Sequence, residues 1–131
     1  YISIADKMLF KSGSAIVSDR AKEVLGKVAT VVNGRPEMEV QVEGYTDNVP
    51  ISTECMKDNW DLSVARATSV VRVLQGDFAV DPGRLIAAGR SEYVPLETND
   101  TAEGRSINRR TRIVILPKLE EFFEILEQKP E

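Results

Sequence analysis

The sequence predicts an α+β fold, a two-layer sandwich in which two main helices cover one face of a mixed β-sheet of about four strands, in the order βαβαββ. Two segments carry apolar residues at the three-and-four spacing of an amphipathic helix, and four short segments have the composition or alternation of strands. Two such helices pack most economically on one face of a single small sheet. The chain has 131 residues, 42% of them hydrophobic, which is enough to bury one core without disulfides or metals.

The first predicted elements are a strand and a helix. Residues 2–10 carry alternating isoleucines followed by an apolar group, and they predict a short strand that ends at a turn over residues 11–14. The next segment has one apolar face, and Ser18 or Asp19 can cap its first turn. Residues 33–36, Asn-Gly-Arg-Pro, end this helix because glycine accepts the C-cap conformation and proline cannot continue a helix.

A second strand, a long loop and a second helix follow. Apolar and polar residues alternate over 38–42, which predicts a strand with one buried face and places Glu43 on its solvent side. Residues 44–58 are rich in Asp, Asn, Ser and Thr and include Pro50, a composition too polar and broken for regular structure, so we predict a loop. The second helix begins near Asn59 and closes at residues 75–77.

The last part of the sheet comes from two further strands. The turn at residues 81–83 leads into a strand over 84–90, and residues 92–101 are again loop. Branched and polar residues alternate over 109–116, which predicts the final strand, and Pro117 ends it.

Two shorter elements complete the prediction. Thr101 or Asp100 can cap one short helical turn before the final strand. Residues 118–131 carry large apolar side chains at helical spacing, which predicts a C-terminal amphipathic helix. We therefore expect one domain over residues 1–117 and a helical tail over 118–131.

The charge and composition exclude several classes of function. The net charge is −4, which argues against binding to nucleic acid. The absence of histidine removes the usual general base and the commonest zinc ligand, so we expect no metal and no cofactor. Cys55 is the single cysteine and has no partner within the chain. There is no apolar run long enough for a membrane span, and we expect the chain to be a fragment of a membrane-associated protein whose anchor lies upstream of Tyr1.

Three polar motifs stand apart from the core pattern. They are Gly-Tyr-Thr-Asp at 44–47, Asn-x-x-Leu-Ser-x-x-Arg-Ala at 59–67, and Gly-Arg-x-x-Asn-Arg-Arg at 104–110. Supporting motifs are Leu-Phe-x-Ser-Gly-Ser-Ala at 9–15 and Asp-Pro-x-Arg-Leu at 81–85. Together and in this order they resemble the OmpA C-terminal domain family of peptidoglycan-binding modules.

The resemblance covers about residues 8–116, with two departures. Tyr45 stands where the family usually has histidine, which matters little if that side chain is scaffolding. Asp47 and Arg66 are 66 − 47 = 19 positions apart, a longer spacing than in the plainer members, because residues 48–58 include an insertion. Asp-Asn-Val-Pro-Ile at 47–51, followed by Asn-Trp-Asp-Leu-Ser at 59–63, resembles the MotB-like branch of the family, found in flagellar-motor stators.

The resemblance implies a non-catalytic domain that anchors a membrane or envelope protein to the cell wall in the periplasm. Its ligand is diaminopimelate of the peptidoglycan stem peptide, which carries an ammonium and a carboxylate on one carbon. Asp47 can accept hydrogen bonds from the ammonium, and Arg66 can grip the carboxylate with two parallel N–H bonds. The other candidate binding residues are Thr46, Asn59, Arg109 and Arg110.

Alternatives remain open from the residues alone. Asn59 is also a plausible helix cap, and Asp47 a loop residue bonded to its own backbone. Glu43 and Asp47 are four positions apart and can be interpreted as the carboxylate pair of a wall hydrolase. A third interpretation is an assembly or dimerisation module, forming a homodimer, that acts through the helix at residues 119–126 and the arginine-rich final strand. The parent protein can be a stator, an outer-membrane barrel or a lipoprotein.

Overall fold

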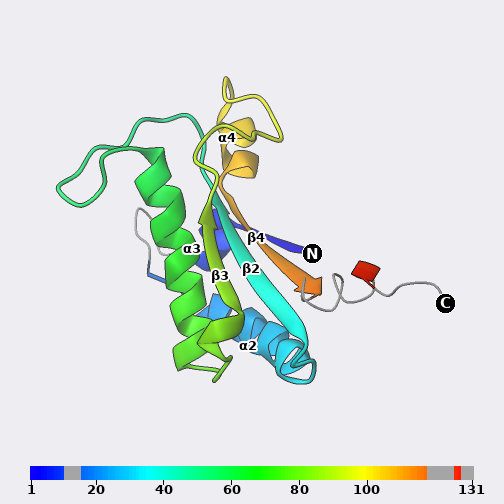
Figure 1. The fold of residues 1–131 in the computed structure, drawn as a ribbon. Coiled ribbons are helices and arrows are strands. Elements are labelled where there is room, and N and C mark those ends of the chain that lie inside the picture. Colours follow the sequence, from blue (N-terminus) through cyan, green and yellow to red (C-terminus); the bar gives the residue numbers. More distant parts are fainter. Residues whose placement is uncertain (11–15, 118–125, 128–131) are drawn as a thin grey trace.

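The predicted α+β fold is confirmed by the computed structural model, which describes residues 1–10, 16–117 and 126–127 (Figure 1). Most of the predicted tail helix lies outside the described residues, so the division at residue 117 stays a prediction. None of the described helices combines the length and apolarity needed to cross a bilayer. The elements are β1 (Ile2–Ala5), α1 (Asp6–Leu9), α2 (Asp19–Asn33), β2 (Met38–Tyr45), α3 (Asn59–Gly76), the 3-10 turn η1 (Pro82–Arg84), β3 (Leu85–Gly89), α4 (Ala102–Asn108) and β4 (Arg110–Pro117).

The sheet is mixed and has the strand order β1-β4-β2-β3. β2 runs parallel to β3 and antiparallel to β4, and β4 also pairs antiparallel with β1. Val42 near the middle of β2 lies opposite Ile113 of β4 and Ala87 of β3, which fixes the register. Because the side chains of a strand alternate between faces, this register gathers the branched residues of the central strands on one face.

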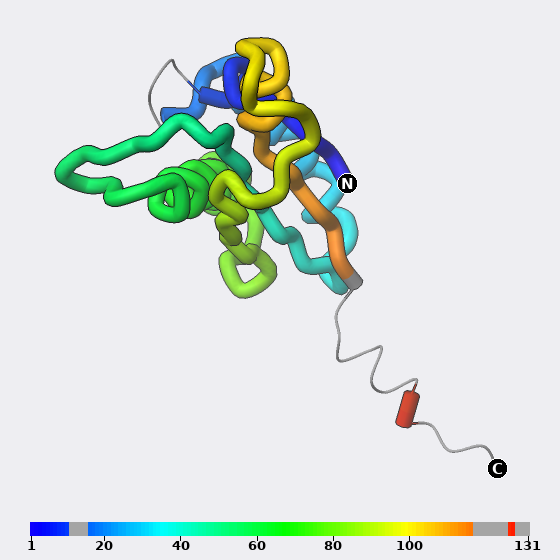
Figure 2. The backbone as a smooth tube through the Cα atoms, turned by 90° about the horizontal axis from the view of Figure 1, so that it is seen from above, coloured from blue at the N-terminus to red at the C-terminus, as the bar shows by residue number. Residues whose placement is uncertain are grey.

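The core lies between that face of the sheet and the helices α2 and α3. α3 packs against β2 and β3, and Figure 2 shows this arrangement from above. One cluster of buried residues joins all three elements, and each fully buried aliphatic side chain contributes about 1.5–3 kcal/mol to stability. Its members include Val40 and Val42 of β2, Leu25 of α2, and Val70 and Leu74 of α3.

The beginning of the chain differs from the prediction. The first strand ends at Ala5, and the residues that follow form the single helical turn α1 instead of continuing the strand to Phe10. The backbone N–H of Asp6 donates to the carbonyl of Arg109 at 3.0 Å, and that of Phe10 donates to the carbonyl of Asp6 at 2.9 Å. This turn brings Leu9 and Phe10 into the core, where a straight strand would leave them apart from it.

Helices α2, α3 and α4 each begin after a residue that caps the first turn, and for α3 this residue is Asp58 instead of Asn59. Ser18 caps α2 by accepting from a first-turn N–H at 3.1 Å, and Thr101 caps α4 at 3.0 Å. Asp58 caps α3 at 3.2 Å, so Asn59 is free for another role. The helix after Thr101 runs over seven residues, longer than the single turn that was predicted.

The second strand is longer than predicted, and Glu43 on its polar face is buried. β2 extends through Tyr45. Glu43 is only 4% exposed, so the prediction that it faces solvent is wrong. Arg112 lies directly opposite Glu43 on β4, and its Nε lies 3.8 Å from the carboxylate, while the Nε of Arg90 lies 3.4 Å away. Two arginine side chains therefore cover an acid on the sheet face that carries no helix.

Helix α3 lies unusually close to the sheet at two glycines. A Cβ atom on Gly44 of β2 would lie 2.1 Å from the carbonyl oxygen of Ser63, and one on Gly89 of β3 would lie 2.5 Å from the Ser63 hydroxyl. Only residues without a Cβ permit this approach. The first half of α3 is thereby held over the carboxyl-terminal end of β2.

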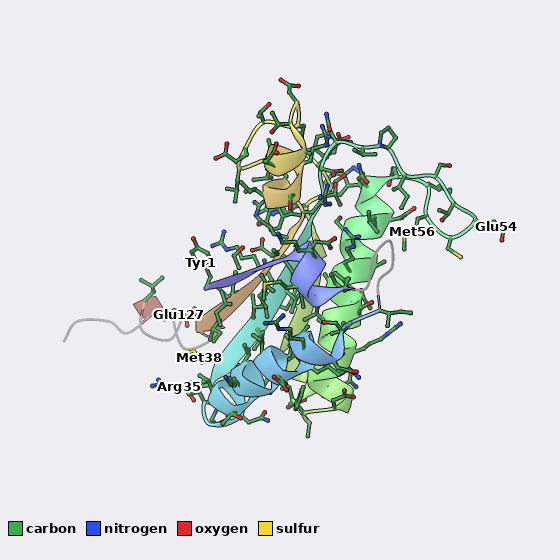
Figure 3. All side chains as sticks on the ribbon, turned by 180° about the vertical axis from the view of Figure 1, so that it is seen from behind. Tyr1, Arg35, Met38, Glu54, Met56 and Glu127 are labelled. Carbon is green, nitrogen blue, oxygen red and sulfur yellow. The ribbon has the colours of Figure 1, made fainter. Side chains whose placement is uncertain are left out.

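The long loop between β2 and α3 projects away from the sheet in both Figures 1 and 2. Figure 3 places Glu54 and Met56 at its outer tip. The tip closes on itself, because the backbone N–H of Thr53 donates to the Met56 carbonyl at 2.8 Å. The predicted loop over residues 44–58 is therefore confirmed from residue 46 onward.

Candidate functional site

A cavity of about 300 Å³ opens at the carboxyl-terminal end of β2, between the first half of α3 and the residue that precedes β4. It brings together five of the six residues predicted to bind a ligand. The four apolar residues of its wall were not singled out from the sequence. The lining residues are Thr46, Asp47, Val49, Pro50, Ile51, Asn59, Leu62, Arg66 and Arg109.

The Asp47 carboxylate is fixed by two hydrogen bonds of different kinds. One oxygen accepts from the backbone N–H of Val49 at 3.0 Å, which is the local loop bond expected of such a residue. The other accepts from the guanidinium of Arg109 at 2.6 Å, a charge-assisted bond. The carboxylate lines the cavity and retains acceptor capacity toward it.

Thr46 and Asn59 hold the backbone around Asp47. The Thr46 hydroxyl donates to the Asp47 carbonyl at 2.8 Å, and its backbone N–H donates to the carbonyl of Ser91 at 2.9 Å. The side-chain amide of Asn59 donates to the carbonyls of Asp47 and Val49, each at 3.2 Å. Both side chains are buried, so they attach the first residues of the loop to the body of the protein.

Arg66 is a buried cation whose donors are incompletely satisfied. The residue is 7% exposed, and Nη1 lies 3.1 Å from Oδ1 of Asp6 in an ion pair without hydrogen-bond geometry. Neither Nε nor Nη1 has a hydrogen-bond partner among the described residues. Burial lowers the pKa of Arg66, while Asp6 acts in the opposite direction. The guanidinium carbon lies 5.4 Å from the centre of the Phe10 ring. A carboxylate in the cavity would supply the missing acceptors.

Asp6 is the functional candidate that the sequence did not reveal. Its carboxylate pairs with Arg66, and its backbone N–H bonds to Arg109. Burial raises the pKa of Asp6, against the lowering effect of the Arg66 and Arg109 cations. No spacing rule connects residues so distant in the chain, and the helical turn that carries Asp6 was itself missed.

Arg110 lies away from the cavity. Its guanidinium donates to the carbonyls of Asn108 and Val94, each at 3.2 Å, and stacks 3.8 Å from the centre of the Tyr45 ring. Consecutive residues at the start of a strand point to opposite faces, so only Arg109 of this pair lines the cavity. The stack on Arg110 also gives Tyr45 the scaffolding role expected at the position where the family usually has histidine.

The carboxylate pair of the hydrolase alternative is not brought together. Asp47 lines the cavity, whereas Glu43 does not and is held by the arginines of the neighbouring strand and loop. In the part of the chain that the structure describes, no three potential metal-ligating side chains come together as a group.

Comparison with known proteins agrees with this geometry. The model of the OmpA family matches residues 9–109. Motility protein B from Bacillus subtilis (strain 168) is 35% identical over 117 residues, which cover 89% of this chain and 45% of that protein. The chain therefore spans less than half the length of this curated relative.

Two solved structures share the fold at substantial identity. A putative MotB like protein from Desulfovibrio vulgaris superposes with a TM-score of 0.80 and 32% identity, covering 88% of this chain and 74% of that one. The cell wall anchor of the T6SS from Pseudomonas aeruginosa gives a TM-score of 0.78 and 39% identity, covering 88% and 80%. The chain therefore belongs to the OmpA family, whose peptidoglycan-binding domains are non-catalytic.

Proposed function

We propose that the cavity binds peptidoglycan through the free end of a diaminopimelate residue in the stem peptide. The observation that carries this proposal is Arg66, a buried guanidinium with two unsatisfied donors that lines the same cavity as the Asp47 carboxylate. A ligand that places one carboxylate and one ammonium a few Å apart matches this pair of opposite charges.

Each part of the ligand has a counterpart in the cavity. The ammonium lies against Asp47, whose carboxylate keeps acceptor capacity beyond its bonds to Val49 and Arg109. The carboxylate lies against Arg66, and its charge supplies the acceptors that Nε and Nη1 lack. The methylene groups between the two ends of diaminopimelate face the apolar wall that includes Ile51 and Leu62.

We further infer that the domain anchors a membrane or envelope protein to the cell wall in the periplasm, and that the parent is MotB-like. The support is the likeness to Motility protein B, to the putative MotB like protein and to the cell wall anchor of the T6SS. The long loop at residues 46–58 supports the same branch. The membrane segment of the parent lies outside this chain in this proposal, and homodimer formation stays a prediction.

Calorimetric titration with two synthetic stem tetrapeptides tests the ligand assignment. One contains meso-diaminopimelate and the other contains lysine, which lacks the second carboxylate. We expect the diaminopimelate peptide to bind at least about tenfold more tightly, since a lost charged contact at a buried site costs about 2–5 kcal/mol. Equal affinity for the two peptides, or no binding of either, would contradict the assignment.

A further inference from the structure

Asp6 supplies a carboxylate to the same cation that we assign to the ligand. Its Oδ1 lies 3.1 Å from Nη1 of Arg66, and the two side chains are 16% and 9% exposed. Arg66 therefore has a resident anion beside it, although that anion leaves Nε and Nη1 without hydrogen bonds.

The charges around the site form a balanced set before any ligand is considered. Asp6 and Asp47 are acidic, Arg66 and Arg109 are basic, and the four lie close enough to influence one another electrostatically. A ligand carboxylate at Arg66 brings a second anion to one guanidinium. Two carboxylates that share such a site cannot both stay fully ionised without a large electrostatic cost. One of them has to lose its charge.

Asp6 is the carboxylate that gives up its charge most readily. The Asp47 carboxylate accepts two hydrogen bonds, from the backbone N–H of Val49 and from the guanidinium of Arg109. Among the described residues, none donates a hydrogen bond to the carboxylate of Asp6. Burial also raises the pKa of Asp6, despite the cations Arg66 on α3 and Arg109 ahead of β4, and Asp47 acts in the same direction as burial. The ligand carboxylate shares its carbon with an ammonium, so its pKa lies below the value of about 3.5 for a peptide α-carboxyl. It therefore stays ionised where Asp6, whose pKa is raised, takes up a proton.

We propose that Asp6 positions Arg66 in the free protein and that the ligand carboxylate replaces Asp6 as the ion-pair partner of Arg66. Each binding event then takes up one proton from solvent onto the Asp6 carboxylate. This inference rests on the proposed function, because it requires a ligand carboxylate at Arg66. The ligand ammonium is paired with Asp47, so the proton on Asp6 compensates for the second carboxylate beside Arg66, and the ion pair of Asp6 with Arg66 becomes an ion pair of the ligand with Arg66. Asp6 is thus a positioning residue that makes affinity depend on pH.

Titration of the wild-type domain with the diaminopimelate tetrapeptide in buffers of different ionisation enthalpy measures this proton directly. We expect net proton uptake in the acid range and an affinity that rises as the pH is lowered from neutral toward the raised pKa of Asp6, by at most tenfold per pH unit. Binding with no proton uptake and no pH dependence would overturn the inference while leaving the proposed function standing. Absence of binding at every pH would overturn the proposed function itself.

A pair of matched variants identifies the group. Asp6→Asn keeps the shape of the side chain and removes the charge, so we expect binding about fivefold or more tighter at neutral pH and nearly independent of pH. Asp100→Asn makes the same change at an exposed loop position outside the cavity and should behave as wild type. A purely structural role of Asp6 predicts a lower melting temperature with the proton uptake unchanged, and that result would refute the assignment. If Asp6→Asn does not fold, the wild-type proton uptake decides alone.

Discussion

The carboxylate of Asp47 and the guanidinium of Arg109 lie 2.6 Å apart at the mouth of the cavity, and the side chain of Arg109 is 37% exposed. Arg66, which lines the same cavity, is almost completely buried. An exposed arginine can rearrange in solvent at little cost, whereas a buried one is held by its surroundings. Arg109 can therefore move away from Asp47 when a ligand ammonium binds there, whereas Arg66 keeps its position in the site.

Replacement of Arg66 should abolish wall binding. Arg66→Ala removes the N–H donors for the ligand carboxylate, and we expect a loss of about 2–5 kcal/mol in binding free energy. Arg66→Lys keeps the charge but not the planar fork, so it should recover only part of the affinity. Pull-down with purified sacculi, beside thermal unfolding of each variant, measures both effects. Binding near the wild-type level by a folded Arg66→Ala protein would exclude Arg66 from the site.

Neutralisation of Asp47 should weaken binding without unfolding the domain. Asp47→Asn keeps an oxygen for the N–H of Val49 but loses the charge that faces Arg109 and the ligand ammonium. We expect at least about tenfold weaker binding of the diaminopimelate tetrapeptide, because charge-assisted hydrogen bonds are roughly twice as strong as neutral ones. Calorimetry at low and high salt checks this. An unchanged dissociation constant would show that the ammonium lies elsewhere.

The loop tip should be dispensable. Deletion of residues 53–56 removes a turn closed by the Thr53 to Met56 hydrogen bond and leaves intact the cavity residues on either side. We expect a loss of less than about 2 kcal/mol in the free energy of unfolding and near-normal sacculus binding. Urea unfolding and pull-down measure the two quantities. Loss of the cooperative transition would show that the tip contributes to the core.

Arg84 should stabilise the fold and leave binding unaffected. Its guanidinium donates to the backbone carbonyls of Met38, Val32 and Arg35, which joins the end of α2 to the start of β2. Arg84→Met removes these hydrogen bonds at a cost of about 2–4 kcal/mol, since a hydrogen bond to a charged group contributes about 1.5–3 kcal/mol. The carbonyls of Val32 and Arg35 keep backbone N–H donors. We expect a lower urea midpoint with an unchanged dissociation constant for the tetrapeptide under native conditions. A midpoint equal to that of wild type would contradict this role.

The stability of the free domain should also report the titration of Asp6. The pKa of Asp6 in the folded protein lies above its ordinary value of 3.8, so the folded state holds this proton more tightly than the unfolded state. The contribution of Asp6 to stability is therefore greatest below 3.8 and falls as the pH rises through the raised pKa. We expect the free energy of unfolding of wild type, relative to Asp6→Asn, to decrease with pH across the acid range and then to level off. Parallel pH curves for the two proteins would refute this.

Local patterns predicted most of the fold. The alternation over residues 38–42 and the apolar face behind Ser18 each depend on neighbours in sequence, and both were confirmed. The same holds for the four-stranded mixed sheet with two covering helices. The motifs also predicted that Asp47 and Arg66 line one cavity, because the family resemblance supplied the tertiary relation that spacing alone does not contain.

The features that escaped prediction depend on distant contacts. Glu43 follows the polar alternation of its strand and is buried only because Arg112 and Arg90 lie over it. The helical turn at Asp6 is stabilised by a hydrogen bond from its backbone N–H to the carbonyl of Arg109, a residue far away in the sequence. The choice between Arg109 and Arg110 depends on which face of β4 each side chain reaches, and a shift of one residue reverses that choice.

The two glycines beneath α3 set the dimensions of the binding site without lining it. Gly44 and Gly89 determine how near Ser63 lies to the sheet, and Ser63 stands on α3 between Asn59 and Arg66. A side chain at either glycine would lift the helix and withdraw Arg66 from Asp47, although neither glycine contacts the cavity. Substitution of either glycine would therefore weaken affinity for the cell wall. A search limited to residues that contact the ligand would not identify these two positions. A comparison of wall binding among relatives therefore has to consider the distance between α3 and the sheet as well as the charged residues of the cavity.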